Sequence, residues 1–190
     1  DADDLKFRFG LGSPTYTYML QVMEDAWDKV KDSESMNIKL RIWKNHMEIV
    51  YGKTPTERSF LEQTYLVVLV KLLLYLRIYG SYNQSQLDVT QILTGQYFRT
   101  FGISNLVEEG YYSWILDNRI YNIIKSSLEA LLKELMKYDT AKISEDLFKE
   151  IYQEIVRKED RHRVGEYYTP EWLAELTLNE AFAYHQTINP

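Results

Sequence analysis

The feature that most constrains this chain is the apolar run 65–79, in which only Lys71 and Arg77 are charged. A helix that is apolar on every side has no face to turn toward water, so other elements or lipid must surround it. Crossing a bilayer takes about 20 apolar residues. This run is shorter and carries two cations. We therefore expect it to be the buried central helix of a bundle and not a membrane span.

Lys71 lies near the middle of this run. An unpaired charge is costly in such a position. Two interpretations remain open for it. Either its ammonium is salt-bridged or reaches out of the core along an apolar stem, or it contacts a phosphate or a carboxylate.

Helix-start signals divide the rest of the chain into further helices. Ser13-Pro14 and the capping box from Thr54 to Glu57 each combine a cap with an early proline. Asp88 and Ser144 are expected caps of later helices, whereas residues 1–12 predict an irregular lead-in. Residues at helical spacing follow, all of them apolar except His46. For three of the helices they are Tyr16, Met19, Leu20, Met23, Ala26, Trp27 and Val30; Ile38, Ile42, Trp43, His46, Ile49 and Val50; and Ile120, Ile123, Ile124, Leu128, Leu131, Leu132 and Leu135.

Composition supports an all-α fold and excludes several functions. The 190 residues include only 8 Gly and 4 Pro, which argues against a turn-rich β fold, and the predicted fold is a helical bundle. A net charge of −6 is not that of a dedicated nucleic-acid binder, although local contact with DNA stays open. The chain has no Cys, so it has no disulfide and no thiolate metal site or nucleophile, which fits a cytoplasmic location.

Two stretches carry side chains suited to nucleic acid. Aromatic residues near Arg99 form either a stacking surface for bases or a cover over the bundle; they are Tyr97, Phe98, Phe101, Tyr111, Tyr112 and Trp114. A basic segment follows later, with Arg157, Lys158, Arg161 and Arg163. Its cations either stabilise a helix C-terminus or contact DNA phosphates. We place the domain boundary here, with a helical connector at 1–160 and the start of a second domain at 161–190.

The segment Gly165-Glu-Tyr-Tyr-Thr-Pro170, followed by Glu171-Trp-Leu-Ala174, resembles the Gly-x-Tyr/Phe-Tyr/Phe-Thr-Pro segment of adenine-N6 DNA methyltransferases. The helical part is similar to the spacer of single-chain type II restriction-modification enzymes, including type IIG. That likeness rests on Thr64-Tyr-Leu66 with Lys71, and on Ile103 to Glu108 before Trp114. The resemblance implies S-adenosylmethionine as the cofactor, DNA as the partner and adenine N6 as the methyl acceptor.

By the same resemblance, Tyr167, Tyr168, Thr169 and Pro170 line the cofactor pocket. Their chemistry suits that ligand. Aromatic faces attract a sulfonium cation, and a helix that starts with Thr169 as cap and Pro170 at its first position offers free amides to a carboxylate.

The sequence lacks the other parts of such an enzyme. It has no Gly-rich loop after a strand, no Asn-Pro-Pro-Tyr tetrad and no Glu-x-Lys nuclease motif. No metal-ligand spacing links His46, His162 and His185. We therefore expect no catalytic residue and no methylase activity in this chain alone. It begins at Asp1 without methionine, and we expect it to be cut from a longer enzyme that carries the methylase and, in restriction-modification systems, a fused nuclease.

A second hypothesis is a helical protein-interaction module with no nucleic-acid role. It predicts an exposed apolar patch and a stable oligomer.

Overall fold

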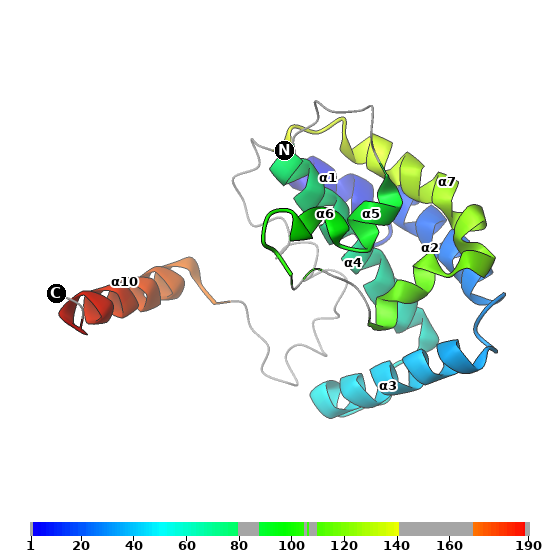
Figure 1. The fold of residues 1–190 in the computed structure, drawn as a ribbon, viewed down its shortest axis with the longest axis horizontal. Coiled ribbons are helices and arrows are strands. Elements are labelled where there is room, and N and C mark those ends of the chain that lie inside the picture. Colours follow the sequence, from blue (N-terminus) through cyan, green and yellow to red (C-terminus); the bar gives the residue numbers. More distant parts are fainter. Residues whose placement is uncertain (1, 80–87, 105, 107–109, 141–168, 189–190) are drawn as a thin grey trace.

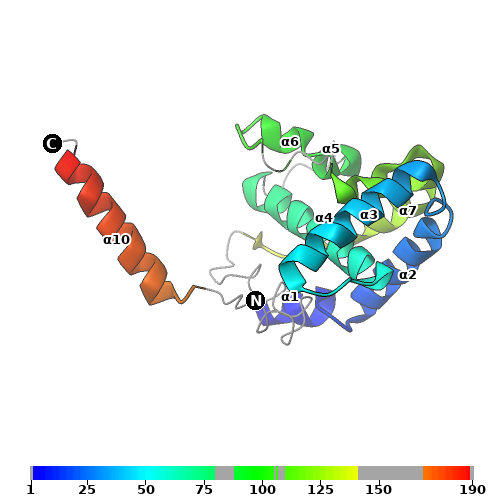
Figure 2. The same ribbon diagram turned by 90° about the horizontal axis from the view of Figure 1, so that it is seen from below.

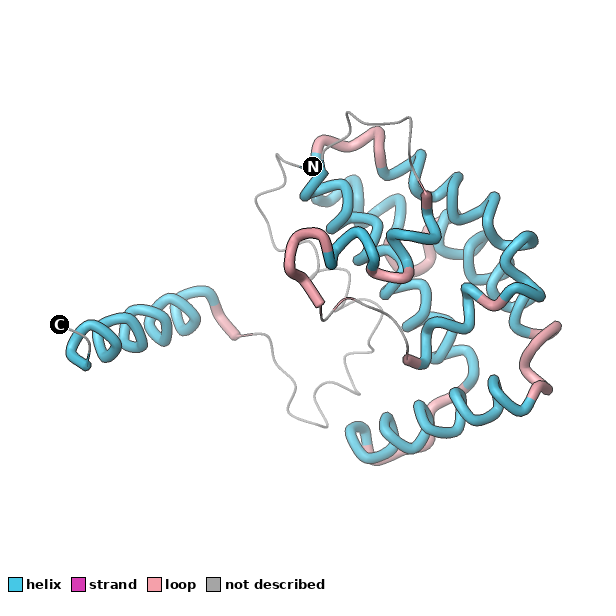
Figure 3. Tube along the Cα trace, viewed as in Figure 1, coloured by secondary structure: helices cyan, strands magenta, loops and turns pink. Residues whose placement is uncertain are grey.

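The structure, a computed structural model, describes residues 2–79, 88–104, 106, 110–140 and 169–188. All regular elements in these ranges are helices, and no strand occurs among them, so the predicted all-α class is confirmed (Figure 3). In chain order they are α1 (Ala2–Phe9), α2 (Pro14–Trp27), α3 (Glu34–Tyr51), α4 (Glu57–Tyr79), α5 (Val89–Leu93), α6 (Gln96–Arg99), the 3-10 helix η2 (Tyr111–Leu116), α7 (Asn118–Leu135) and α10 (Glu171–Ile188) (Figure 1).

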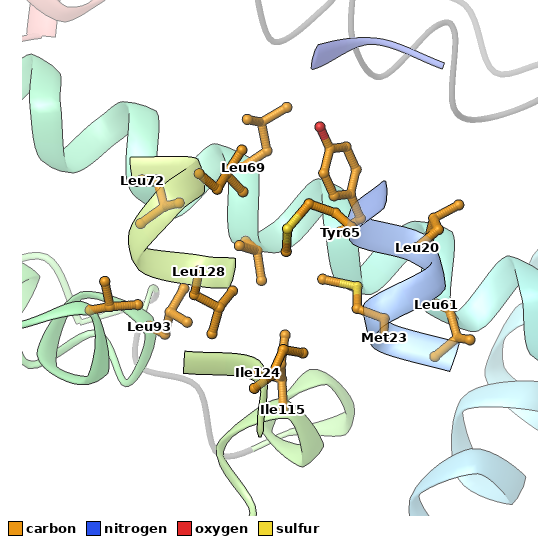
Figure 4. Packing of buried hydrophobic residues seen from close by; sticks show 14 of the residues in the cluster. Leu20, Met23, Leu61, Tyr65, Leu69, Leu72, Leu93, Ile115, Ile124 and Leu128 are labelled. Atoms are coloured by element: carbon orange, nitrogen blue, oxygen red, sulfur yellow. The ribbon is translucent and has the colours of Figure 1, made fainter. Parts of the chain in front are cut away.

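Helix α4 is the centre of the bundle, as its uniform apolar character predicts. The helices α2, α3, α5 and α7 all pack against it. Figure 4 shows side chains from α2, α5, α7 and η2 meeting around the buried Tyr65, Leu69 and Leu72. Over Glu57–Ile78, α4 is also long and apolar enough to cross a membrane by length and composition alone, a test that a buried core helix passes equally.

An aromatic cluster closes one end of this core. The ring of Phe60 on α4 lies 5.2 Å from that of Trp27 and 5.1 Å from that of Trp43, between centroids. Trp114 of η2 packs 5.1 Å from Trp27, and its indole N–H donates to Thr64 Oγ1 at 3.0 Å. Offset and edge-to-face pairs of this kind add to the stabilisation from area burial. The cluster therefore fixes α2, α3 and η2 around one end of α4.

Among the helices of the bundle, two predicted caps are confirmed and one is wrong. Ser13 accepts a hydrogen bond from the Tyr16 amide at 3.1 Å, and Asp88 accepts one from the Thr90 amide at 2.9 Å. The expected capping box from Thr54 to Glu57 does not form. Instead Thr56 caps α4 by accepting from the Ser59 amide at 3.1 Å. Both threonines are suitable caps, and the chain uses the one directly before the first helical residue.

The irregular lead-in predicted for residues 1–12 is also wrong over most of its length, because Ala2–Phe9 forms α1. Leu5 and Phe9 are buried one turn apart, and the Tyr65 hydroxyl of α4 donates to the Phe9 carbonyl at 2.7 Å. Tyr138, beyond α7, packs on Phe9 and donates to the Asp4 carboxylate at 2.7 Å. Contacts with distant residues, which local pattern does not reveal, hold this short helix.

Helix α3 turns the opposite face inward from the one that its isoleucines indicate. Met36, Leu40 and Trp43 are buried, whereas Ile38, Ile42 and Ile49 are exposed, Ile49 by 83% of its surface. Both sets follow helical spacing, so the sequence does not decide between them. Trp43 decides it here, since its ring fits against Phe60 and its indole N–H reaches polar partners on the bundle.

The amphipathic helix predicted at 117–138 is confirmed as α7, with one residue assigned to the wrong face. Asp117 caps it by accepting from the Arg119 amide at 3.0 Å. Ile124 is fully buried, but its neighbour Ile123 keeps 43% of its surface exposed.

These two isoleucines give a matched test of the packing. Ile124→Ala should lower the free energy of unfolding by about 3 kcal/mol, because it leaves a cavity in the core. Ile123→Ala should lower it by less than about 1 kcal/mol, since less apolar surface is removed from contact. Urea denaturation followed by circular dichroism measures both. Equal losses for the two variants would contradict the orientation of α7.

A second test concerns Tyr138 at alkaline pH. Partial burial, and then the hydrogen bond to Asp4, raise the pKa of Tyr138 from 10.0 to about 12. A raised folded-state pKa contributes stability that is complete below pH 10 and is lost as pH rises toward 12. Tyr138→Phe should therefore lose less stability than the wild type across this interval. Denaturant midpoints at pH 9, 10, 11 and 12 compare the two proteins, and parallel curves would contradict the assignment.

Candidate functional site

The predicted cofactor segment lies only partly within the described residues. Tyr167 and Tyr168 lie outside them, whereas Thr169 and Pro170 are exposed immediately before α10. The predicted DNA-contacting residues Arg157, Lys158, Arg161 and Arg163 also lie outside the described part, as does the helix expected after Ser144. The structure thus places two of the eight predicted site residues, and both are accessible.

The start of α10 is shifted by one residue from the predicted position. The Pro170 carbonyl accepts hydrogen bonds from the Leu173 and Ala174 amides at 2.9 and 3.0 Å. Pro170 therefore occupies the cap position that was expected for Thr169, and Glu171 is the first helical residue. The amides of Glu171 and Trp172 precede the helical hydrogen-bond ladder. An anionic group such as a carboxylate binds at amides in that position.

Helix α10 itself is apolar around most of its circumference. Trp172 is 65% exposed, and Leu178 and Phe182, which project from another side of the helix, are exposed as well. Figure 2 shows α10 apart from the bundle. A helix with apolar side chains on several sides is normally buried in a larger layer. The surface of α10 is therefore suited to packing against further protein.

Lys71 is buried, with 3% of its surface exposed, and its ammonium donates to the Leu93 carbonyl at 2.8 Å. Leu93 is the last residue of α5, where the negative end of the helix dipole favours a cation. This contact gives Lys71 a structural role, since it fixes the end of α5 against α4. It favours the core interpretation of Lys71 over contact with an external phosphate.

A polar network joins α3 to the bundle at Trp43, Gln63 and Tyr112. The Trp43 indole N–H donates to Gln63 Oε1 and to the Tyr112 hydroxyl, at 3.1 Å each. The Tyr112 hydroxyl in turn donates to the same Gln63 oxygen at 2.7 Å. Three elements, α3, α4 and η2, thereby meet at one amide.

Two further contacts flank this network along α3. The Lys39 ammonium donates to the Gly110 carbonyl at 3.0 Å and to Ser113 Oγ at 2.8 Å. His46 Nδ1 lies 2.8 Å from the Tyr111 hydroxyl. Sequence reasoning missed the network, because its partners are far apart along the chain and none belongs to a motif.

The network has the properties of a structural contact between helices. In the described part of the chain every buried side-chain nitrogen or oxygen has a hydrogen-bond partner, and no cluster of three His, Asp or Glu side chains is placed to hold a metal ion. Buried polar groups whose hydrogen bonds are all made rigidify a structure. We conclude that these side chains hold α3 and η2 on the bundle.

The aromatic residues between 97 and 114 favour the interpretation as a cover over the bundle. Phe98 and Trp114 are fully buried, and the half-buried Tyr97 packs 5.2 Å from Tyr75, so these rings cover the bundle. Phe101 is half exposed and Arg99 is exposed. One exposed ring beside one cation does not form the row of stacking platforms typical of single-strand binders.

Comparison of the chain with protein-family models, with curated proteins and with solved structures finds no match to any of them. The functional argument therefore rests on the residues themselves.

Gln63 tests the network directly. Gln63→Leu should lower the free energy of unfolding by about 1–3 kcal/mol, because the Trp43 N–H and the Tyr112 hydroxyl lose a shared acceptor. Gln21→Leu is the matched control on an exposed face of α2 and should change stability by about 0.5 kcal/mol or less. Urea denaturation measures both variants. A neutral Gln63→Leu would show that the network does not hold α3.

Proposed function

We propose that this chain is the helical connector and the leading methylase segment of an S-adenosylmethionine-dependent adenine-N6 DNA methyltransferase. In this proposal the enzyme combines restriction and modification, residues 1–160 are the connector, and residues 161–190 open the methylase domain. The sequence Gly165-Glu-Tyr-Tyr-Thr-Pro170 is the observation that carries the proposal.

The exposure of Thr169 and Pro170 supports it. A Thr-Pro pair that served only to start a helix of the bundle would be expected to pack against that bundle. Here it precedes a helix whose own apolar side chains, including Trp172 and Phe182, are uncovered. Such a helix fits the edge of a further domain, where the segment before it is accessible to a ligand.

The proposed roles of the side chains follow from their chemistry. The ring faces of Tyr167 and Tyr168 hold the adenine or the sulfonium of the cofactor, and the amides at the start of α10 receive its carboxylate. Arg157, Lys158, Arg161 and Arg163 contact DNA phosphates. Methyl transfer itself takes place on residues outside this chain, which alone has no methylase activity.

The bundle supplies a rigid spacer in this scheme. Its central helix is surrounded, and α3, η2 and α5 are fastened to it by the hydrogen bonds of Gln63 and Lys71. A spacer of this kind holds two domains at a fixed separation on DNA.

A second candidate function is a protein-interaction module. The exposed isoleucines of α3 favour it, because Ile38, Ile42 and Ile49 lie on one face away from the bundle. This module has no nucleic-acid role and is therefore an alternative to the first proposal.

Methyl transfer tests the first proposal. A protein extended through the methylase domain, incubated with labelled S-adenosylmethionine and mixed DNA, should place the label on adenine. The 190-residue chain should transfer none. A folded extended protein that neither binds the cofactor nor labels DNA would reduce the Tyr-Tyr-Thr-Pro segment to a helix start.

The paired tyrosines provide a sharper test in the same extended protein. Changing both Tyr167 and Tyr168 to Ala should weaken cofactor binding by roughly a hundredfold, because two aromatic contacts to a cation are lost. Calorimetric titration measures the binding, and circular dichroism shows that the helical content is kept. Tyr184→Ala, at an exposed position of α10, is the control and should bind as the wild type does. Parallel loss of folding and of binding would instead make the tyrosines core residues.

A further inference from the structure

Two exposed helical faces of this chain have the same spacing of side chains. On α3, Ile38, Ile42, Asn45 and Ile49 follow one another at intervals of four, three and four residues, and all are exposed. On α10, Trp172, Leu176 and Asn179 repeat the first two intervals and are exposed too. Alternating intervals of three and four place side chains along one stripe, as in the contact line of a coiled coil.

The charges of the two helices are complementary. Helix α3 contains Lys39, Arg41 and Lys44 in its middle, and Glu34 and Glu48 near its two ends. Helix α10 contains Glu171, Glu175 and Glu180 and neither Lys nor Arg. Two copies of α10 in parallel would set Glu175 against Glu180, which are like charges. Pairing of α10 with α3 avoids this repulsion.

A parallel alignment that sets Asn45 beside Asn179 also pairs two flanking side chains of opposite charge. In a parallel coiled coil, each contact residue is level with a contact residue of the partner helix. The residue just before such a contact residue then lies beside the partner residue that is five positions after its own counterpart. Arg41 then faces Glu180, and Glu175 faces His46. All four residues are exposed. A polar residue at the same place in both stripes is the device that fixes register in such pairs.

We propose that α3 of one copy of this chain binds α10 of a second copy in this parallel register, and that the reciprocal contact completes a two-fold dimer. Each stripe is uncovered within the single chain, where Trp172 and Ile49 keep most of their surface exposed. A second copy supplies both missing partners at once, because each chain carries one of each helix. The dimer does not depend on the proposed methyltransferase function.

Single cysteines test the pairing, because the chain has none of its own. An equimolar mixture of Asn45→Cys and Asn179→Cys proteins, oxidised with copper phenanthroline, should form a covalent dimer on a non-reducing gel. Neither variant alone should do so. The mixture of Asn37→Cys with Asn179→Cys is the control, since Asn37 is exposed on another side of α3, and it should remain monomeric.

Each other possible partner of α3 or α10 gives a different result in this cross-linking experiment. A covalent dimer of Asn45→Cys alone would mean that α3 pairs with itself, and one of Asn179→Cys alone would mean that α10 does. A monomeric disulfide in the double variant Asn45→Cys, Asn179→Cys would place α10 on α3 of the same chain. Any of the three results overturns the proposal.

Charge reversal gives an independent measurement at exposed positions that folding does not require. Sedimentation equilibrium should show that Arg41→Glu raises the dimer dissociation constant about tenfold or more, since the reversed charge faces Glu180 in both contacts. Glu180→Arg should raise it similarly, and the two changes together should restore the wild-type value. A wild-type protein that is monomeric at 100 µM, or a double variant as weak as the single ones, would overturn the proposal.

Discussion

The fold depends on removing α4 from water on every side. Its apolar side chains point in all directions, so the energy gained by covering it grows with each helix added around it. The polar groups on α4 then decide where those helices lie. Thr64 accepts the Trp114 indole, Gln63 accepts from Trp43 and Tyr112, and Lys71 meets the end of α5. Burial of apolar surface alone would not favour one arrangement of the surrounding helices. The hydrogen bonds of these three side chains determine where the helices lie.

The distribution of apolar residues, together with composition, was enough to predict the all-α class, the central helix and α7. This pattern gave the wrong orientation where two faces of one helix had the same spacing of apolar residues. Helix α3 carries an apolar stripe on each side, and only its contacts with Phe60 and Gln63 show which one is buried. Helix α1 has too few apolar residues to show a period. It exists because Phe9 and Asp4 meet Tyr65 and Tyr138 from distant parts of the chain.

The candidate site divides in the same way. Thr169 and Pro170 were found from sequence, because a short motif carries its own chemistry, and the structure leaves both accessible. Trp43, Gln63 and Tyr112 were not found, because each is an ordinary residue until folding brings the three together. A site made of neighbouring residues can be predicted from sequence, whereas a site made of residues from separate helices cannot.

The orientation of the α3–α10 pair follows from a balance of two costs. Parallel helices align their dipoles, which opposes pairing, but solvent and salt screen this effect at exposed helix ends. An antiparallel pair avoids that cost but sets Asn45 and Asn179 against apolar side chains. Each amide left without a partner in a closed contact costs about 1–3 kcal/mol. The larger penalty therefore selects the parallel arrangement, in which the two asparagines meet each other and the start of α10, with Thr169 and Pro170, lies beside the start of α3.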